Sequence, residues 1–434
     1  MKTTADAIVI GAGVIGSSIA LELSRNGFDV VVVDKAGGMG HGSTSASSAV
    51  VRFNYSSWAG VASSWESLAC WENWSDHLGH EDPAGMASYT RTGMLVIDGG
   101  PTDSNRTTDM FDRAGITWER WGPDEVRKHM PYVDTGSYFP PKPVRSEEFF
   151  SDSHGEITGI FTPDAGHVDD PQLAAQNLGV AAQSLGARFL FNRTVTSIQQ
   201  QDDQRWSVAT SRGESVSARV VVNAAGPWSS AINALAGVGT DFGISSRPMR
   251  QEVHQVPLPA DFEDDGNGMA IADLDLGTYI RTSSARGLLV GGTEPECDPL
   301  EWLDDPDTAN LQATVSGFEN QVTRAARRMP GLSIPNRPSG IGGVYDVTDD
   351  WTPIYDRTDR EGFFVAMGTS GNQFKNAPVA GQLMAHLVTA VQDGHDHDSQ
   401  PLEFICSRTG STFELGTYSR LRTVDPDSPG SVMG

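Results

Sequence analysis

Apolar and polar positions near the start of the chain predict a strand, a helix and a second strand. Residues 8–16 read IVIGAGVIG, an apolar run that breaks into glycines at positions 11, 13 and 16. Residues 14–26 predict a helix, and FDVVVVD at 28–34 predicts a second buried strand that ends on an acid. This order is typical of a dinucleotide-binding unit, which places phosphates over the first turn of the helix.

The residue types in this turn each have a physical role. Gly11 lets the chain turn where a Cβ atom would clash, Gly13 lets the backbone approach a pyrophosphate, and Gly16 lets the helix lie close to the strand. The helix N-terminus offers free N–H groups and a partial positive charge to the phosphates. Asp34 ends the second strand, where it is placed to accept hydrogen bonds from a ribose.

The rest of the chain alternates between helical and strand-like patterns. A helix with an aromatic face is predicted around residues 58–74, whereas residues 101–150 read as irregular. Helices are also predicted at 171–185 and 308–329. The tail after Ser399 is rich in Ser, Asp and Pro, and we expect it to carry little structure. The predicted strands are 92–97, 188–191, 206–210, 217–223, 250–256, 278–281, 288–292 and 362–367.

Strand–helix units therefore occur in three separated parts of the chain, with sheet-like blocks between them. A length of 434 residues also exceeds one comfortable core. We predict an α/β fold in which one domain is assembled from discontinuous segments, and a second domain with a mixed or antiparallel β-sheet covers one face of the cofactor. The expected ranges are 1–90, 153–242 and 336–398 for the cofactor-binding domain, 91–152 and 243–335 for the substrate domain, and 399–434 for a C-terminal tail.

Composition narrows the possible partners. The formal net charge is −25, so the surface repels nucleic acid and anionic membranes. No apolar run approaches the ~20 residues that span a bilayer, and the first strand begins too close to Met1 for a signal peptide. The three cysteines are scattered, without the spacing of a disulfide framework or a metal site. We expect a cytoplasmic protein that binds a small molecule and no metal.

Four motifs carry a resemblance to a known family. They are IVIGAGVIGSSIALELSRNG with VVVDK, GHGSTSASSAVVR, VVNAAGPWSSAINALAG and FFVAMGTSGNQFKNAPVAG. With them the chain resembles the D-amino-acid oxidase superfamily of flavoproteins, in particular the branch of sarcosine oxidase, glycine oxidase and dimethylglycine dehydrogenase. The resemblance implies a Rossmann-like FAD-binding domain, and FAD rather than NAD, a choice that the glycine fingerprint alone leaves open.

The resemblance also implies which residues contact FAD. Family members that tether the flavin use a cysteine where this chain has Gly343, and a histidine and an arginine of the FAD loop are matched by Ser45 and Ala49. We therefore expect non-covalent FAD. The implied FAD-binding residues are Gly11, Gly13, Val14, Ile15, Gly16, Asp34, Lys35, Gly42, Ser43, Thr44, Ser45, Val195, Ala225, Gly226, Trp228, Gly343, Gly371, Asn372, Gln373, Phe374 and Lys375.

In sarcosine oxidase-like enzymes an arginine and a lysine hold the substrate carboxylate over the flavin, and the matching residues are Arg52 and Lys375. The planar fork of arginine matches a carboxylate, and lysine adds a compact charge. Lysine occurs at only five positions in this chain, so its presence inside the most diagnostic motif stands out. Tyr345 matches a family tyrosine that contacts the carboxylate.

Other positions leave the chemistry open. His254, Tyr279 and Arg281 lie on predicted strands and are pocket candidates whose direction the pattern does not determine. An oxygen-activating lysine of some relatives is matched by an apolar residue near Leu289, which admits a dehydrogenase as well as an oxidase. The electron acceptor is then O2 or another molecule.

The resemblance favours an FAD-dependent oxidoreductase that oxidises the C–N bond of a small amino acid by hydride transfer to flavin N5, with a secondary or N-methylated amine preferred. Positioning and desolvation, rather than a general base, would supply most of the acceleration. One alternative is a 2-hydroxy acid or D-amino acid dehydrogenase of the same superfamily. The hydroxy acid reaction needs a base, for which His254 is the candidate. A further alternative is a non-catalytic FAD-bearing subunit.

Overall fold

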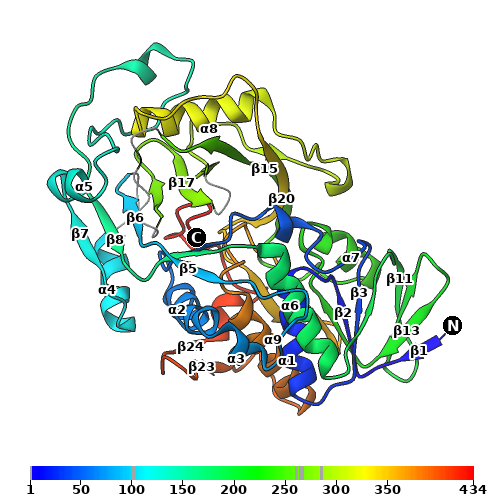
Figure 1. Cartoon of the computed structure of the whole chain (residues 1–434). Coiled ribbons are helices and arrows are strands. Elements are labelled where there is room, and N and C mark those ends of the chain that lie inside the picture. Colours follow the sequence, from blue (N-terminus) through cyan, green and yellow to red (C-terminus); the bar gives the residue numbers. More distant parts are fainter. Residues whose placement is uncertain (1, 100–103, 260–261, 263–267, 284–286) are drawn as a thin grey trace.

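A six-stranded sheet forms the centre of one half of the molecule (Figure 1). The computed structural model describes residues 2–99, 104–259, 262, 268–283 and 287–434. The strand order is β10-β3-β2-β14-β22-β21, and neighbouring strands are parallel except for β22 and β21. The strands are β2 Ala7–Ile10, β3 Val30–Val33, β10 Arg188–Leu190, β14 Val220–Asn223, β21 Ile354–Arg357 and β22 Phe363–Met367.

Both faces of this sheet are covered, which explains why its four central strands are almost wholly apolar. Ala7 and Val9 face one core, and Ile8 and Ile10 face the other. The first core is closed by helices α1 Val14–Arg25, α6 Pro171–Ser184 and α9 Ala377–Gln392. The second is closed by helix α7 Ser229–Ala236 and by a four-stranded sheet of β1 Lys2–Thr4, β11 Val195–Gln200, β12 Trp206–Thr210 and β13 Ser215–Ala218.

The single strand predicted at 217–223 is wrong. The chain breaks at Arg219, so that β13 pairs with β12 in the small sheet while β14 pairs with β2 in the central sheet. β13 reads SVSA and β14 reads VVVN, and no glycine or proline marks the break between them in the sequence. Only the change of pairing partner separates them.

The other half of the molecule is built on a nine-stranded sheet, with order β19-β15-β18-β17-β16-β6-β8-β7 and β20 paired to β15 (Figure 1). Helix α8 Val315–Arg328 packs against this sheet through Phe318, Val322 and Ala325. The strands are β6 Met94–Ile97, β7 Glu119–Trp121, β8 Gly159–Thr162, β15 Ser246–Pro257, β16 Ala270–Asp273, β17 Thr278–Ser283, β18 Gly287–Gly292, β19 Glu301–Trp302 and β20 Gly340–Thr348.

Two details differ from the sequence pattern here. Helix α8 begins later than expected, because Thr314 caps it by accepting a hydrogen bond from the N–H of Gly317. Strands β8 and β20 fall inside ranges expected for the cofactor-binding domain, yet both pair within the nine-stranded sheet. The six domain ranges stay a prediction, and we propose moving these two strands to the substrate domain.

The aromatic helix is present as α2 Trp58–Glu72, followed by the short α3 Trp74–Leu78. The prediction that residues 101–150 are irregular is wrong for part of that range. It contains α4 Ser104–Ala114, strand β7 and α5 Pro123–His129, whose proline occupies the first turn. Residues 101–103 lie outside the described part of the chain.

The expectation of an unstructured tail is also wrong. Strands β23 Glu403–Ile405 and β24 Thr412–Glu414 form a hairpin, followed by a 3₁₀ turn at Leu415–Tyr418. Arg420 then pairs with Asp241 at 2.7 Å and with Asp398 at 2.8 Å. The chain ends between the two halves of the molecule (Figure 1).

Within the described residues, each helix lacks either the length or the apolar character that crossing a bilayer requires.

Candidate active site

A cavity of about 390 Å³ opens where β2, β3 and β14 run into glycine-rich turns. Gly11 has φ +110°, and a Cβ atom there would lie 2.2 Å from the carbonyl oxygen of Ala224. A Cβ atom on Gly16 would lie 2.0 Å from the carbonyl oxygen of Gly11. Both contacts are with backbone atoms, so only glycine permits this approach of turn, helix and strand. The resulting cradle fits the pyrophosphate of a dinucleotide.

The rim of this cavity carries the acid and the lysine of the VVVDK motif. Asp34 Oδ2 accepts a hydrogen bond from the N–H of Ala12 at 2.6 Å, which fixes the carboxylate beside the glycine turn. Lys35 pairs with Asp307, and its Nζ lies 3.7 Å from the ring centroid of Trp228. The indole N–H of Trp228 donates to the same Asp307 at 3.0 Å. Asp307 therefore holds both residues in place.

Most of the predicted FAD-binding residues line this cavity, and their contacts with FAD stay a prediction. Gly16 and Ser45 lie outside the lining, Gly16 because it packs against Gly11. Gly343, in β20, is also outside it, as are Asn372 and Lys375, which line a second cavity; no cysteine of the described chain lines the larger one. The lining includes Gly11, Gly13, Val14, Ile15, Asp34, Lys35, Gly42, Ser43, Thr44, Val195, Ala225, Gly226, Trp228, Gly371, Gln373 and Phe374.

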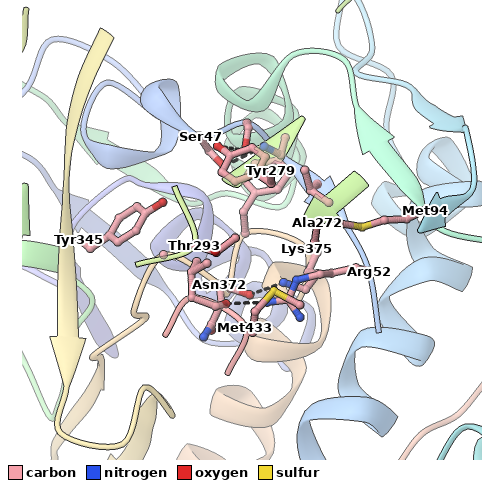
Figure 2. A pocket seen from close by; sticks show the side chains of 16 residues that line it. Ser47, Arg52, Met94, Ala272, Tyr279, Thr293, Tyr345, Asn372, Lys375 and Met433 are labelled. Carbon is pink, nitrogen blue, oxygen red and sulfur yellow. Dashed lines mark hydrogen bonds between the residues drawn. The ribbon is translucent and has the colours of Figure 1, made fainter. Parts of the chain in front are cut away.

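A second cavity, of about 60 Å³, adjoins the first. Ser47, Tyr345, Gly371 and Phe374 line both cavities, so a ligand in the smaller one contacts whatever fills the nearby end of the larger one. In Figure 2, Arg52, Lys375 and Asn372 converge at one end of the small cavity and Tyr345 lies across from them.

The two predicted cations, Arg52 and Lys375, meet in the small cavity. Arg52 follows strand β4 Val50–Val51 and is 5% exposed, while Lys375 precedes α9 and is 3% exposed. The Arg52 Cζ and the Lys375 Nζ lie 5.2 and 5.0 Å from the ring centroid of Tyr55. Lys375 Nζ donates to the carbonyl oxygen of Asn372 at 2.6 Å.

Within the described chain, neither cation forms an ion pair with a carboxylate. Burial lowers the pKa of Arg52, and burial together with the charge of Arg52 holds the pKa of Lys375 well below its usual value. Two buried cations without a partner anion are costly, because their charge has lost most of its hydration. An anionic ligand that bridges them would remove that cost.

Aromatic and polar groups complete the small cavity. Tyr345 lines it from β20, and burial raises its pKa well above the ordinary value, so the phenol stays protonated. Tyr279 lines it from β17 and donates from its hydroxyl to Ser48 Oγ at 2.9 Å. Arg281 is buried outside the lining and donates from Nε to the Ser48 carbonyl oxygen at 2.6 Å. Arg281 thus positions the loop and does not face the cavity.

His254 lies apart from the other residues predicted to be catalytic, and its role stays a prediction. Its side chain is fully buried in the nine-stranded sheet, where Nε2 lies 3.3 Å from Glu252 Oε2 and the ring packs edge-on against Phe318. Burial lowers the pKa of His254. On strand β15 the alternation of side chains directs this residue toward α8 and away from both cavities.

Sequence reasoning missed several residues of the small cavity. Val432 and Met433 line it from the tail, which the pattern assigned to disorder. Glu294 also lies close to the cavity, with its charge acting on Arg52. Glu294 directly follows the GGT motif at the end of strand β18. The sheet that contains β18 was expected to face the cofactor, so the position of Glu294 in the sequence could have marked it as a residue near the site.

Comparison with known proteins agrees with this fold. A family model described as FAD dependent oxidoreductase (DAO) matches residues 6–387. The chain is 25% identical over 396 residues to the glycine oxidase of Geobacillus kaustophilus, covering 90% of this chain and 94% of that protein. It is 24% identical over 429 residues to FAD-dependent oxidoreductase domain-containing protein 1 of Xenopus laevis, covering 88% of this chain and 79% of that protein. L-proline dehydrogenase from P. horikoshii has a similar solved structure, with a TM-score of 0.74 and 21% identity. The match covers 97% of this chain and 98% of that one.

Proposed function

The chain belongs to the DAO family of FAD-dependent oxidoreductases, and we propose that it oxidises the C–N bond of a small amino acid, preferably a secondary or N-methylated amine. The family membership confirms the resemblance drawn from the four motifs, and FAD is the cofactor. One observation carries the proposal. Arg52 and Lys375, buried and unpaired with any carboxylate of the described chain, share a small cavity that adjoins the cofactor cavity.

The two cations favour a substrate with a carboxylate. A carboxylate that bridges a guanidinium and an ammonium forms charge-assisted hydrogen bonds, each worth about 1.5–3 kcal/mol in a dry pocket. The same contact would raise the pKa of Lys375, which burial and the charge of Arg52 hold well below its usual value. Binding and protonation are therefore coupled at this site.

The size of the cavity favours a small substrate. With the tail in place the cavity has a volume of about 60 Å³, between walls formed by Met94, Ala272, Tyr279 and Met433, which leaves room for few heavy atoms. The relative from Geobacillus kaustophilus is named for glycine, and the similar solved structure for L-proline, a secondary amine. Both names support an amino acid with a small or cyclic side chain.

FAD supplies the hydride acceptor when bound, and the residues of the chain supply position and exclude water. The loop that carries Lys375 is rigid, because Trp71 donates from its indole N–H to the Lys375 carbonyl oxygen at 2.7 Å and stacks on Phe374 at 5.5 Å. A rigid clamp holds the Cα–H bond of the substrate at a fixed place beside the cofactor cavity, which is the kind of positioning that accelerates a reaction without a base.

The competing functions fit the site less well. A hydroxy acid dehydrogenase needs a base at the hydroxyl, and His254, the candidate for that role, lies outside both cavities. No histidine is among the described residues that line the small cavity, and the carboxyl of Glu294 beside it already accepts hydrogen bonds from Gln251 and from the main chain of Val432. A non-catalytic subunit gives no reason for two buried cations beside the cofactor cavity.

An anaerobic substrate screen tests the proposal. Purified holoenzyme is mixed without oxygen with sarcosine, N,N-dimethylglycine, proline and D-amino acids, and with lactate and glycolate as controls. We expect at least one amine to bleach the flavin absorbance and the hydroxy acids to leave it unchanged. Bleaching by hydroxy acids alone would overturn the proposal. Admitting air afterwards separates an oxidase, which reoxidises fast, from a dehydrogenase, which reoxidises slowly.

A further inference from the structure

The last residues of the chain enter the small cavity. Val432 and Met433 line it, and the carbonyl oxygen of Gly434 accepts a hydrogen bond from the N–H of Ser56 at 3.0 Å. Met433 is 7% exposed. The segment 431–434 therefore occupies space next to the cation pair, where Figure 2 shows Met433 beside Arg52 and Asn372.

The main chain of Val432 bridges the side chains of Arg52 and Glu294. Its carbonyl oxygen accepts a hydrogen bond from Arg52 Nη2 at 2.5 Å, and its N–H donates to Glu294 Oε2 at 2.9 Å. The nitrogen and the carbonyl of one residue are separated by a single Cα atom. This is the skeleton of an α-amino acid, with the acceptor oxygen on the arginine and the amine nitrogen on the carboxylate.

Glu294 has an unusual backbone conformation and a fixed side chain. Its φ is +53°, a left-handed conformation that costs a non-glycine residue free energy and is enriched at functional sites. Its other oxygen, Oε1, accepts from Gln251 Nε2 at 2.9 Å, which fixes the carboxylate plane. Oε2 is thereby aimed at Val432.

We propose that Val432 occupies the position of the amino-acid substrate, so that Arg52 and Glu294 recognise the carboxylate and the amine of that substrate, and segment 431–434 withdraws when it binds. The inference rests on the proposed function and adds two things to it. Glu294 becomes the residue that selects amino acids over simple carboxylic acids, and the tail becomes a plug that competes with the substrate.

The tail is anchored just before the plug, which makes withdrawal local. Ser428 Oγ donates to the carbonyl oxygen of Asp350 at 2.6 Å, and Arg422 pairs with the Asp350 carboxylate at 2.9 Å. Gly430, exposed and with φ +62°, lies between this anchor and the plug. Rotation about glycine backbone bonds is easy, so residues 431–434 can leave the cavity while Ser428 stays in place.

A matched pair of unreactive ligands tests the role of Glu294. 2-Aminoisobutyrate has no Cα–H bond to oxidise, and isobutyrate lacks only its amine. Dissociation constants for both are measured with the holoenzyme by calorimetry. We expect 2-aminoisobutyrate to bind wild type at least 10-fold tighter, and Glu294→Gln to remove that preference while changing the isobutyrate constant less than 2-fold. Equal binding of the two ligands to wild type, or equal weakening of both by Glu294→Gln, would overturn the assignment.

Variants of the tail test the plug. Val432→Pro lacks the N–H that bonds to Glu294, so we expect both ligands to bind this variant 3- to 10-fold tighter than wild type. Val424→Pro, at an exposed position of the same tail, is the matched control and should bind as wild type does. Weaker or unchanged binding to Val432→Pro would show that the tail is a fixed wall of the site.

Hydrogen exchange on unmodified holoenzyme gives a readout that needs no variant. Saturation with 2-aminoisobutyrate should speed amide exchange in the peptide that contains Val432, because its N–H leaves Glu294. Exchange that slows or stays the same contradicts withdrawal. Failure of the proposed function gives a different result from failure of the tail proposal. In that case no amine bleaches the flavin, although 2-aminoisobutyrate still binds and releases the tail.

Discussion

Arg52 donates a hydrogen bond of 2.5 Å to the carbonyl oxygen of Val432, which lies 380 residues further along the chain. The contact joins the clamp predicted from one motif to a tail that no motif marks. Because the donor is buried and charged, the acceptor stands in a place where a substrate carboxylate would form a stronger bond. The proposed substrate site is therefore bordered by residues that lie far apart in the sequence.

Removal of the Arg52 guanidinium should weaken carboxylate binding. Arg52→Ala loses one or two charge-assisted hydrogen bonds, so we expect the dissociation constant of acetate, measured by perturbation of the flavin spectrum, to rise about 10- to 100-fold. Lys128→Ala serves as the control, because Lys128 is exposed and lies far along the sequence from Arg52 and Lys375. An acetate constant within 2-fold of wild type in Arg52→Ala would contradict the clamp.

A methyl group at Gly11 should abolish FAD binding. Gly11→Ala combines a left-handed φ with a Cβ atom 2.2 Å from a backbone oxygen, so the turn must deform. Gly186→Ala is a matched control, with φ +103° and no atom within 4 Å of the added Cβ. We expect the control to lose about 1–2 kcal/mol of stability and to keep its FAD. The FAD-to-protein absorbance ratio checks both, and a yellow Gly11→Ala protein would contradict the expectation.

The stability of the protein should depend on the ionisation of Glu294. Burial raises the pKa of this carboxyl from 4.5 to about 8. A group with a raised pKa in the folded state stabilises the fold fully below its unfolded pKa, and that contribution is lost as pH rises through the folded pKa. Between pH 5 and 8 the unfolding free energy of wild type should therefore fall relative to Glu294→Gln. Urea unfolding at several pH values measures the difference, and parallel profiles would contradict it.

His254 should matter for stability and not for catalysis. His254→Gln disturbs the packing against Phe318 and the contact with Glu252, so we expect the melting temperature to fall by a few degrees. The kcat/KM for the amine that bleaches the flavin should stay within 2-fold of wild type, because the residue lies outside both cavities. A large loss of kcat/KM in a folded variant would instead indicate that His254 acts as a base.

Much of the fold follows from patterns within short stretches of sequence. Apolar runs such as 7–10 and 30–33 become strands buried on both faces, and the spacing of glycines at 11, 13 and 16 becomes the turn that shapes the cofactor cavity. These features depend on side-chain size and backbone sterics between near neighbours. A single sequence contains that information directly.

The sequence by itself therefore determined the cofactor cradle and the family, and it predicted Arg52 and Lys375 as the clamp. Only the tertiary structure decided that His254 faces a core, that β13 and β14 belong to different sheets, and that Val432 lies between Arg52 and Glu294. Each of these outcomes depends on which distant segments pack together. Periodicity shows that a residue is buried, but the partner that covers it is chosen by long-range packing.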